Sequence, residues 1–302
     1  MLKFIAKRIL ISLGLLIAFS FVMYGIIFLM MYTRTGFRWP FFATYFSYVL
    51  EVFRGGLGWS TMARRPVTDV IADSMWTSFT IVLTGVTIAY LIAIPLGIRS
   101  AIYKNSAFDN SVSILSTIGI SFPMFFWGAI FIRVFSVQLG WFPASGMISN
   151  YLPHDVSRAH IFFNRIWHLI LPVMIMIILN IGALLRYTRT SMIEALSSNY
   201  IQTHKVYGIN RNAIINKFAF KNTAAPISTH MGRMLPTIFA GAMIIEVIFA
   251  IDGIGFVAFR ALIAGDIALI MGINMFLGVL AILGSLLSDI GYAVLDPRIR
   301  IS

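Results

Sequence analysis

The sequence of 302 residues contains no cysteine and few charged residues, which make up only 11% of the chain. The absence of cysteine excludes disulfides, thiolate metal sites and cysteine nucleophiles, although it leaves the redox compartment undetermined. Apolar residues make up 59% of the chain, a composition that does not fit a soluble globular domain. Together these values predict a membrane protein.

The sequence also lacks the motifs that carry enzyme chemistry. It has no His-Glu-x-x-His, no Gly-x-Ser-x-Gly, and no Gly-x-x-x-x-Gly-Lys-Ser/Thr loop that would cradle a nucleotide phosphate. The five histidines are dispersed without the spacing of metal ligands. We therefore expect a protein that is not an enzyme and that holds no metal or cofactor of its own.

Long apolar runs, each sufficient to cross a hydrocarbon core of about 30 Å, are separated by short polar segments. They predict an all-α polytopic membrane protein with six transmembrane helices. The predicted spans are residues 9–32, 76–98, 112–139, 169–185, 235–251 and 267–288.

This pattern divides the chain into two parts. Residues 1–75 are expected to form an N-terminal transmembrane helix and an external loop, and residues 76–302 a five-helix core with a cytoplasmic loop over 189–226. Within the external loop, residues 45–53 have an amphipathic pattern that suits a helix on the membrane surface, but an ordinary ordered loop is the expectation.

The formal charge of +12 is spread unevenly over the loops. With the N-terminus inside, fourteen Lys and Arg residues fall on the inner side and eight on the outer side. This bias follows the positive-inside rule and predicts that both termini are cytoplasmic. Because the cations mark the cytoplasmic loops, nucleic acid is not an expected partner.

Three polar residues inside the predicted spans are candidates for a transport pathway: Arg133, Glu246 and Asn180. An ionisable group at membrane depth costs at least about 2.5–3.5 kcal/mol unless it faces a partner or a watery cavity. The alternatives are that Arg133 reaches outward to the membrane surface, that Glu246 is a structural hydrogen-bond partner, and that Asn180 hydrogen-bonds across helices.

The segment 189–226 is the longest polar, helix-compatible stretch between two apolar runs. Glu194 is expected in the first turn of its first helix, where a negative charge meets the positive helix end. Gly208 is expected to provide a left-handed stop, and a second helix fits residues 211–220. Such a pair of short helices either lies on lipid or fills a groove in a partner. The apolar positions with helical spacing are Met192, Ile193, Leu196, Tyr200 and Ile201.

The same segment resembles the EAA loop of the permease subunits of ATP-binding-cassette importers. The resemblance extends over the whole chain to the B-type permeases of the oligopeptide/dipeptide/nickel family, although Asn199 and Val206-Tyr207 depart from the family pattern. The loop motif consists of Glu194, Ala195, Leu196, Tyr200, Thr203 and Gly208, and further motifs are 168–172, 186–192, Lys221-Asn222, Glu246 with Gly253-Ile254-Gly255, and Asp296-Pro297-Arg298.

The resemblance implies a type I importer permease fold in the cytoplasmic (inner) membrane, in contact with lipid. It implies three kinds of protein partner: a second homologous permease subunit, two ATP-binding subunits that hold ATP and Mg, and an extracytoplasmic substrate-binding protein. The six residues of the loop motif would couple the permease to the ATPase. The implied substrates are short peptides, with nickel or metal chelates and cationic antimicrobial peptides as alternatives. An ion-coupled secondary carrier that uses Arg133 or Glu246 is a competing function, and an intramembrane enzyme is disfavoured.

Overall fold

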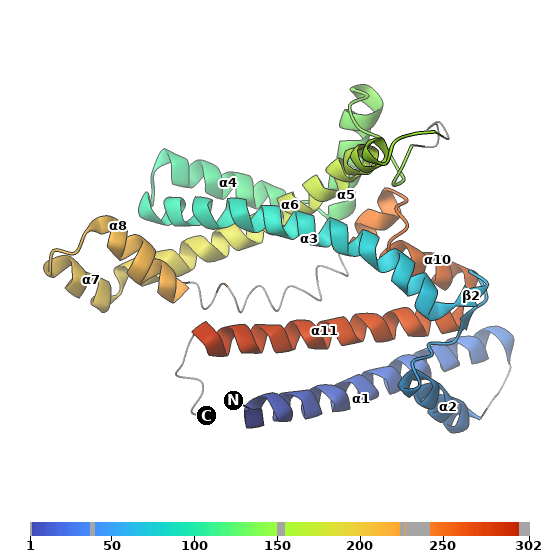
Figure 1. The fold of residues 1–302 in the computed structure, drawn as a ribbon. Helices are drawn as coiled ribbons and strands as arrows, with labels where there is room; N and C mark the ends of the chain where they lie inside the picture. Colours follow the sequence, from blue (N-terminus) through green and yellow to red (C-terminus); the bar gives the residue numbers. More distant parts are fainter. Residues whose placement is uncertain (1, 37–39, 150–154, 224–226, 228–241, 296–302) are drawn as a thin grey trace.

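The computed structural model describes residues 2–36, 40–149, 155–223, 227 and 242–295, and this part of the chain is almost entirely helical (Figure 1). Residues 242–248 are also helical. The helices are α1 (Leu2–Thr35), α2 (Phe41–Phe53), α3 (Val67–Ile102), α4 (Ala107–Ser121), α5 (Met124–Phe131), α6 (Arg158–Ser197), α7 (Asn199–Val206), α8 (Arg211–Ala213), α10 (Ile254–Ala264) and α11 (Ile267–Leu295), with π-helical turns η1 (Ile132–Gln138) and η2 (Ile214–Ala219) and a hairpin of β1 (Trp59–Ser60) and β2 (Arg65–Pro66).

Four helices in the described part of the chain are long and apolar enough to cross a membrane: residues Ile9–Leu29 of α1, all of α3, all of α6, and Ile267–Leu286 of α11. Each overlaps one of the predicted spans. Of the predicted span 235–251, residues 235–241 lie outside the described residues, and residues 242–248 are helical. The described chain is therefore a polytopic helical membrane protein with four spans, or five if a bent helix pair is counted as one.

The bent pair corrects the prediction of a continuous span over 112–139. There α4 and α5 with η1 meet at an angle of 97°. The break lies at Phe122, which has extended backbone angles (φ −103°, ψ 142°), and at Pro123. Proline cannot donate a helical hydrogen bond, and its ring disfavours a helical conformation of the preceding residue. The apolar run is thus a helix with a sharp corner.

Helices α3 and α6 are much longer than the spans predicted within them. They contain 36 and 40 residues, which correspond to about 54 and 60 Å of helix at 1.5 Å per residue. Because a hydrocarbon core is about 30 Å thick, both helices continue well beyond it. Residues 67–75, expected in the external loop, are the first turns of α3, and residues 189–197, expected in the cytoplasmic loop, are the end of α6.

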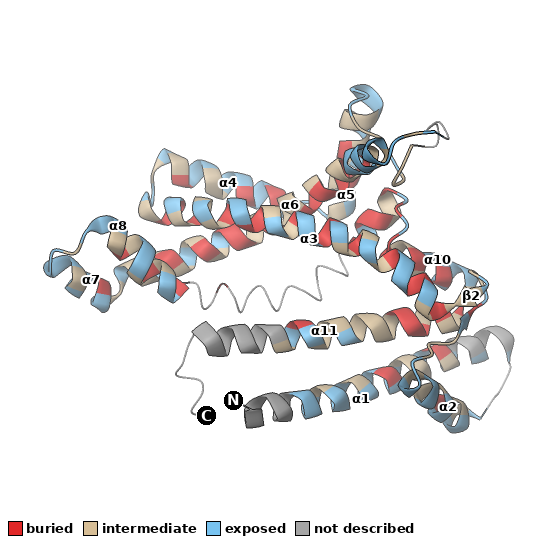
Figure 2. Ribbon diagram, viewed as in Figure 1, coloured by how far each residue is buried: buried red, intermediate tan, exposed pale blue. Residues whose placement is uncertain are grey.

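Helix α6 packs against both α3 and α4, and buried residues follow the faces along which these helices meet (Figure 2). Glycines allow the close approach. A Cβ atom on Gly85 of α3 would lie 2.5 Å from the Cβ of Met176, and one on Gly182 of α6 would lie 2.6 Å from the carbonyl oxygen of Ser116. Since lipid is as apolar as leucine, such contacts between backbones supply the attraction that burial from water supplies in soluble proteins.

Helix α2 corrects the expectation of an ordinary loop over 45–53. One side of α2 packs on α1, where the Tyr45 hydroxyl lies 3.0 Å from that of Ser20 and the Tyr45 ring makes an edge contact with Phe21. The opposite side exposes Phe42, Phe46, Leu50 and Phe53. The amphipathic pattern therefore belongs to a helix, and its exposed apolar side suits the membrane surface.

A buried aspartate ties the hairpin to α11. Asp266 accepts hydrogen bonds from the Ser60 hydroxyl (2.6 Å), the Met62 amide (2.9 Å) and the Leu269 amide (3.1 Å). Burial raises the pKa of the Asp266 carboxyl, but these hydrogen bonds to the ionised form outweigh it, so that the pKa lies below its usual range. The hairpin is thereby fixed to the start of α11.

The elements separate toward two ends of the molecule (Figure 1). We call one the hairpin end, because it holds the hairpin, α2, α10 and the start of α11. The other is the α7 end, which holds the start of α1, the turn between α3 and α4, the end of α6, and α7 with α8. Helix α11 packs on α1 and ends on the α7 side.

Replacing Gly182 with Ala should destabilise the protein by about 1–3 kcal/mol, because the added methyl group forces α4 away from α6. The measurement is thermal unfolding of the purified protein in detergent. Gly14→Ala is the matched control: it also adds a methyl group to a long apolar helix, but no atom lies within 4 Å of the new Cβ. Equal unfolding temperatures for the two variants would contradict the packing argument.

Candidate functional site

The polar segment at the α7 end forms a compact element, which we call the coupling element and define as residues 192–223. Helix α6 runs into it and ends at Ser197, and Ser198, in extended conformation (φ −69°, ψ 150°), separates it from α7. Glu194 therefore lies in the last turn of α6, which corrects the prediction that it lies in a first turn. A carboxylate gains nothing from the helix dipole at the end of a helix. The exposed Glu194 side chain therefore does not stabilise α6 through the dipole.

Gly208 makes the predicted left-handed corner between the two short helical parts of the element. Its φ is +71°. The Ile209 amide donates to the His204 carbonyl (3.2 Å) and the Gly208 amide to the Lys205 carbonyl (3.0 Å). This pair of bonds is a Schellman motif, which satisfies the last carbonyls of a helix and requires a left-handed residue at the corner. The chain then turns into α8 and η2.

A small apolar core holds the coupling element against the ends of α3 and α6. Its centre contains Ile201, which is fully buried, and partly buried Ala195 and Leu196 pack around it. Two of the six predicted coupling residues are thus half-buried supports. The buried members of this core are Ala101, Met192, Ile201, Ile214 and Ala219.

The outer face of the coupling element consists of exposed residues. Of the predicted set, Glu194, Tyr200, Thr203 and Gly208 lie on it. The sequence interpretation did not include Val206 and Tyr207 as contact residues, although their side chains are 87% and 78% exposed. Two adjacent large apolar residues at the end of a polar helix are the signal that marks them. Exposed apolar residues that lie side by side suit contact with another protein or with the membrane surface.

An ion pair fixes the turn between α3 and α4 to α6, just before the coupling element. Arg189 donates from Nε to Asp109 Oδ1 (2.6 Å) and from Nη2 to Oδ2 (2.7 Å). The same carboxylate accepts bonds from the Ser100 hydroxyl and from the Asn105 amide (2.8 Å). Asp109 is 1% exposed. A buried bidentate pair of this kind is strong and directional, so the end of α3, the start of α4 and the end of α6 are held in one arrangement next to the coupling element.

The structure places Glu246 in the core near the hairpin end, completely buried. One oxygen accepts a hydrogen bond from the Ser78 hydroxyl (2.6 Å). The other accepts bonds from the amides of Gly255 (2.7 Å) and Phe256 (3.1 Å) at the start of α10. Both oxygens are therefore engaged in capping α10 and joining it to α3. Glu246 is thus a structural hydrogen-bond partner, which was the alternative to a pathway role. A direct role in transport stays a prediction.

Two glycines next to Glu246 make this arrangement possible. A Cβ atom on Gly253 would collide with the Glu246 carboxylate, and one on Gly255 would collide with the backbone of Met243. The motif Gly253-Ile254-Gly255 thus has a packing explanation: each glycine leaves room for a group from the segment 242–248. Ile254 itself is buried between α3 and α11.

The other two pathway candidates lie on different elements from Glu246. Arg133 is on η1 with an exposed side chain, as expected for a cation that reaches outward. Asn180 is buried in α6, and its side-chain amide donates to the Met176 carbonyl (2.7 Å) of the same helix. The expected hydrogen bond across helices is therefore not the one that this amide makes. Within the described residues no hydrogen bond or ion pair joins the three candidates to one another, and their role in a pathway stays a prediction.

Comparison with known proteins fits this architecture. Residues 93–301 match the family described as the binding-protein-dependent transport system inner membrane component. The chain is 31% identical over 268 residues to the oligopeptide transport system permease protein AppB of Bacillus subtilis (88% of this chain, 83% of the relative). It is 30% identical over 276 residues to the dipeptide transport system permease protein DppB of Escherichia coli (86% and 81%).

A putative peptide permease protein of Brucella suis is 28% identical over 325 residues and is matched over the full length of both chains. The chain therefore belongs to the family of inner membrane components of binding-protein-dependent transport systems. It is a multi-pass inner-membrane permease and a transport component of an ATP-binding-cassette importer.

Replacing Glu246 with Ala should lower the free energy of unfolding by about 1–3 kcal/mol, because the Gly255 and Phe256 amides lose their buried acceptor. Glu246→Gln should cost less, since one acceptor oxygen remains. Thermal unfolding in detergent measures both. Glu51→Ala, which removes an exposed carboxylate from α2, is the control and should leave the unfolding temperature unchanged. The capping role is wrong if all three variants unfold at the wild-type temperature.

Proposed function

We propose that this chain is the permease subunit of an ATP-driven importer that carries short peptides across the cytoplasmic membrane. The observation that carries the proposal is the coupling element, with its glycine corner and its exposed apolar residues Val206 and Tyr207. No motif for a nucleotide phosphate occurs in the sequence, so in an ATP-driven importer a partner has to bind and hydrolyse the ATP. The peptide substrate is supported by the names of the relatives, which carry oligopeptides and dipeptides.

The proposed topology has six transmembrane helices of the type I importer fold and cytoplasmic N- and C-termini, with the α7 end inside. Three observations support it. The start of α1 and the end of α11 point to the same end of the molecule as the coupling element. The excess of cations in the segments assigned to the inside follows the positive-inside rule. The family match over 93–301 lies within the proposed core of residues 76–302 and does not include the proposed N-terminal part, residues 1–75.

The proposed assembly contains a second homologous permease, two ATP-binding subunits that carry ATP and Mg, and an extracytoplasmic substrate-binding protein. In it, Glu194, Tyr200, Thr203 and the patch at Val206 contact an ATP-binding subunit. Ala195 and Leu196 support this surface from below. Because the Asp109–Arg189 pair fixes α6 to the turn between α3 and α4, a displacement of the coupling element moves these helices together. ATP hydrolysis in the partner is thereby converted into a helix movement in this chain.

Co-expression with the ATP-binding and second permease subunits tests the proposal. The tagged chain should purify with both, and the complex in proteoliposomes should take up labelled di- and tripeptides when ATP and the binding protein are present. Vesicles without ATP are the control. Metal chelates and cationic antimicrobial peptides are offered in parallel and should be poor substrates. A tagged chain that purifies alone and transports without ATP would instead be a secondary carrier.

Replacing Gly208 with Val should reduce peptide-stimulated ATP hydrolysis at least tenfold without changing membrane insertion. A β-branched residue in left-handed conformation costs about 1–2 kcal/mol or more, so that the corner rearranges, while no transmembrane helix is altered. Gly208→Asn is the matched control, because asparagine tolerates a positive φ and no neighbouring atom lies within 4 Å of the new Cβ. Wild-type ATP hydrolysis in the Val variant would contradict the coupling role of the corner.

A further inference from the structure

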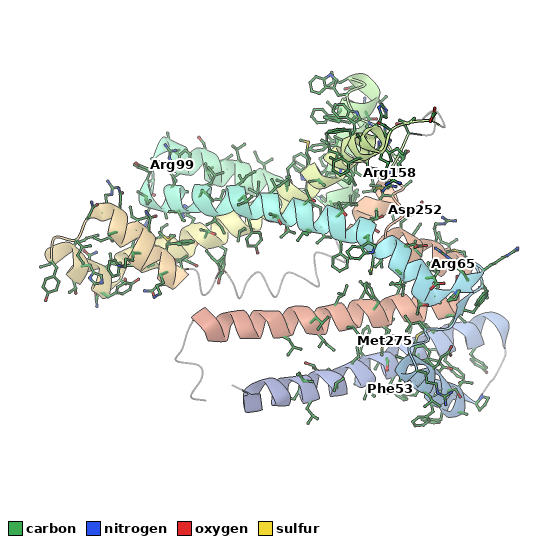
Figure 3. The ribbon with its side chains drawn as sticks, viewed as in Figure 1. Phe53, Arg65, Arg99, Arg158, Asp252 and Met275 are labelled. Atoms are coloured by element: carbon green, nitrogen blue, oxygen red, sulfur yellow. The ribbon has the colours of Figure 1, made fainter. Side chains whose placement is uncertain are left out.

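A cavity lies at the hairpin end, away from the coupling element. Its volume is about 570 Å³, and residues of the hairpin, the first turns of α3, the segment before α6, the first half of α6 and α10 line it. This volume is within the range of small-ligand pockets, about 300–1,000 Å³. Figure 3 shows two of its residues, Arg65 and Asp252, at this end of the molecule. We call this cavity the hairpin-end pocket.

Charges of both signs line the hairpin-end pocket beside an apolar wall. The wall includes Val70, Trp76, Met147 and Val257, a mixture that adapts to side chains of different shape because methionine is flexible and polarizable. Five charged side chains from separate parts of the chain complete the lining, which is unusual in a sequence with so few charges. They are Arg65, Asp73, Arg165, Asp252 and Arg260.

Four of these charged side chains form two exposed ion pairs, and the attraction within each pair is weak. Arg65 Nη1 lies 2.5 Å from Asp73 Oδ2, with side chains 42% and 67% exposed. Arg260 Nη1 lies 4.0 Å from Asp252 Oδ1, with side chains 55% and 75% exposed. Exposed ion pairs contribute about 0–1 kcal/mol, so each charge can exchange its partner for a charged group of a ligand at little cost.

Arg165 is the fifth charge, and it forms no ion pair within the described ranges of the chain. It lies on α6, whereas Asp252 precedes α10, so a cation and an anion reach the pocket from different elements. The lining thus offers an unpaired cation together with a loosely paired anion. Such a pair matches a ligand that carries one positive and one negative group on a short backbone.

We propose that the hairpin-end pocket receives a short peptide with free ends, whose ammonium group binds Asp252 and whose carboxylate binds Arg165. The inference rests on the proposed function and specifies its substrate class further. Charge-assisted hydrogen bonds at both ends discriminate against peptides whose ends are blocked, while the apolar wall tolerates different side chains. Binding of both ends also favours short peptides, because the two charges must fit within one pocket.

The test uses the complete transporter in proteoliposomes with its binding protein and ATP. Uptake of trialanine is compared with uptake of its N-acetylated and C-amidated forms, as kcat/KM, for wild type, Asp252→Asn and Arg165→Gln. Asp252→Asn should reduce kcat/KM for free trialanine at least tenfold and leave the N-acetylated form unaffected. Arg165→Gln should likewise reduce kcat/KM for free trialanine at least tenfold and leave kcat/KM for the C-amidated form unaffected. Since the binding protein is identical throughout, its own selectivity cancels in these ratios.

Arg158→Gln is the matched control. It removes a positive charge from the same helix, at an exposed position outside the pocket lining, and should leave all three uptake rates unchanged (Figure 3). Unaltered ratios in both pocket variants would overturn the inference while the proposed function stands. If the two pocket variants lost binding-protein-stimulated ATP hydrolysis equally with all three peptides, the inference would also be overturned. The pocket would then be a contact site for the substrate-binding protein and not for the peptide. A wild type that takes up no short peptide at all would overturn the proposed function as well.

Discussion

Direct contact between helix backbones holds the membrane part of this permease together. Lipid chains surround the helices, so apolar side chains gain little by leaving lipid for one another, and close packing has to supply the attraction. Gly182 of α6 and Gly85 of α3 bring the two neighbouring helices against α6 from different sides. The coupling element rests on the ends of α3 and α6, and therefore its position depends on these contacts.

Three buried acids connect parts of the chain that are distant in sequence. Asp109 and Asp266 lie in or just before the first turn of a helix, and Glu246 lies against the start of α10; each accepts a backbone amide hydrogen bond there and also binds a side chain of another element. The partial positive charge of a helix start stabilises a carboxylate, which offsets part of the cost of burying it. A chain with eleven acids in total uses three of them in this way.

Local sequence signals predicted those features that depend on local physics. Apolar length located the four described spans, and the left-handed turn at Gly208 followed from its residue type. Pro123 indicates the bend between α4 and α5, but the prediction followed the continuous apolar run and treated the segment as one straight span. The Asp109–Arg189 pair could not be predicted, because 80 residues separate its partners and no periodicity connects them. The capped amides of Gly255 and Phe256 follow Glu246 by only 9 and 10 residues, but its bond to Ser78 could not be predicted, because 168 residues separate the two.

The unbroken length of α6 has a mechanical consequence. A helix of about 60 Å acts as a lever, and a tilt of about 5° around one end displaces the other by about 5 Å. The coupling element is attached to one end of this lever, and the wall of the hairpin-end pocket is built partly on the other. A small displacement of the coupling element can thus change the shape of the hairpin-end pocket without any change of secondary structure along the way.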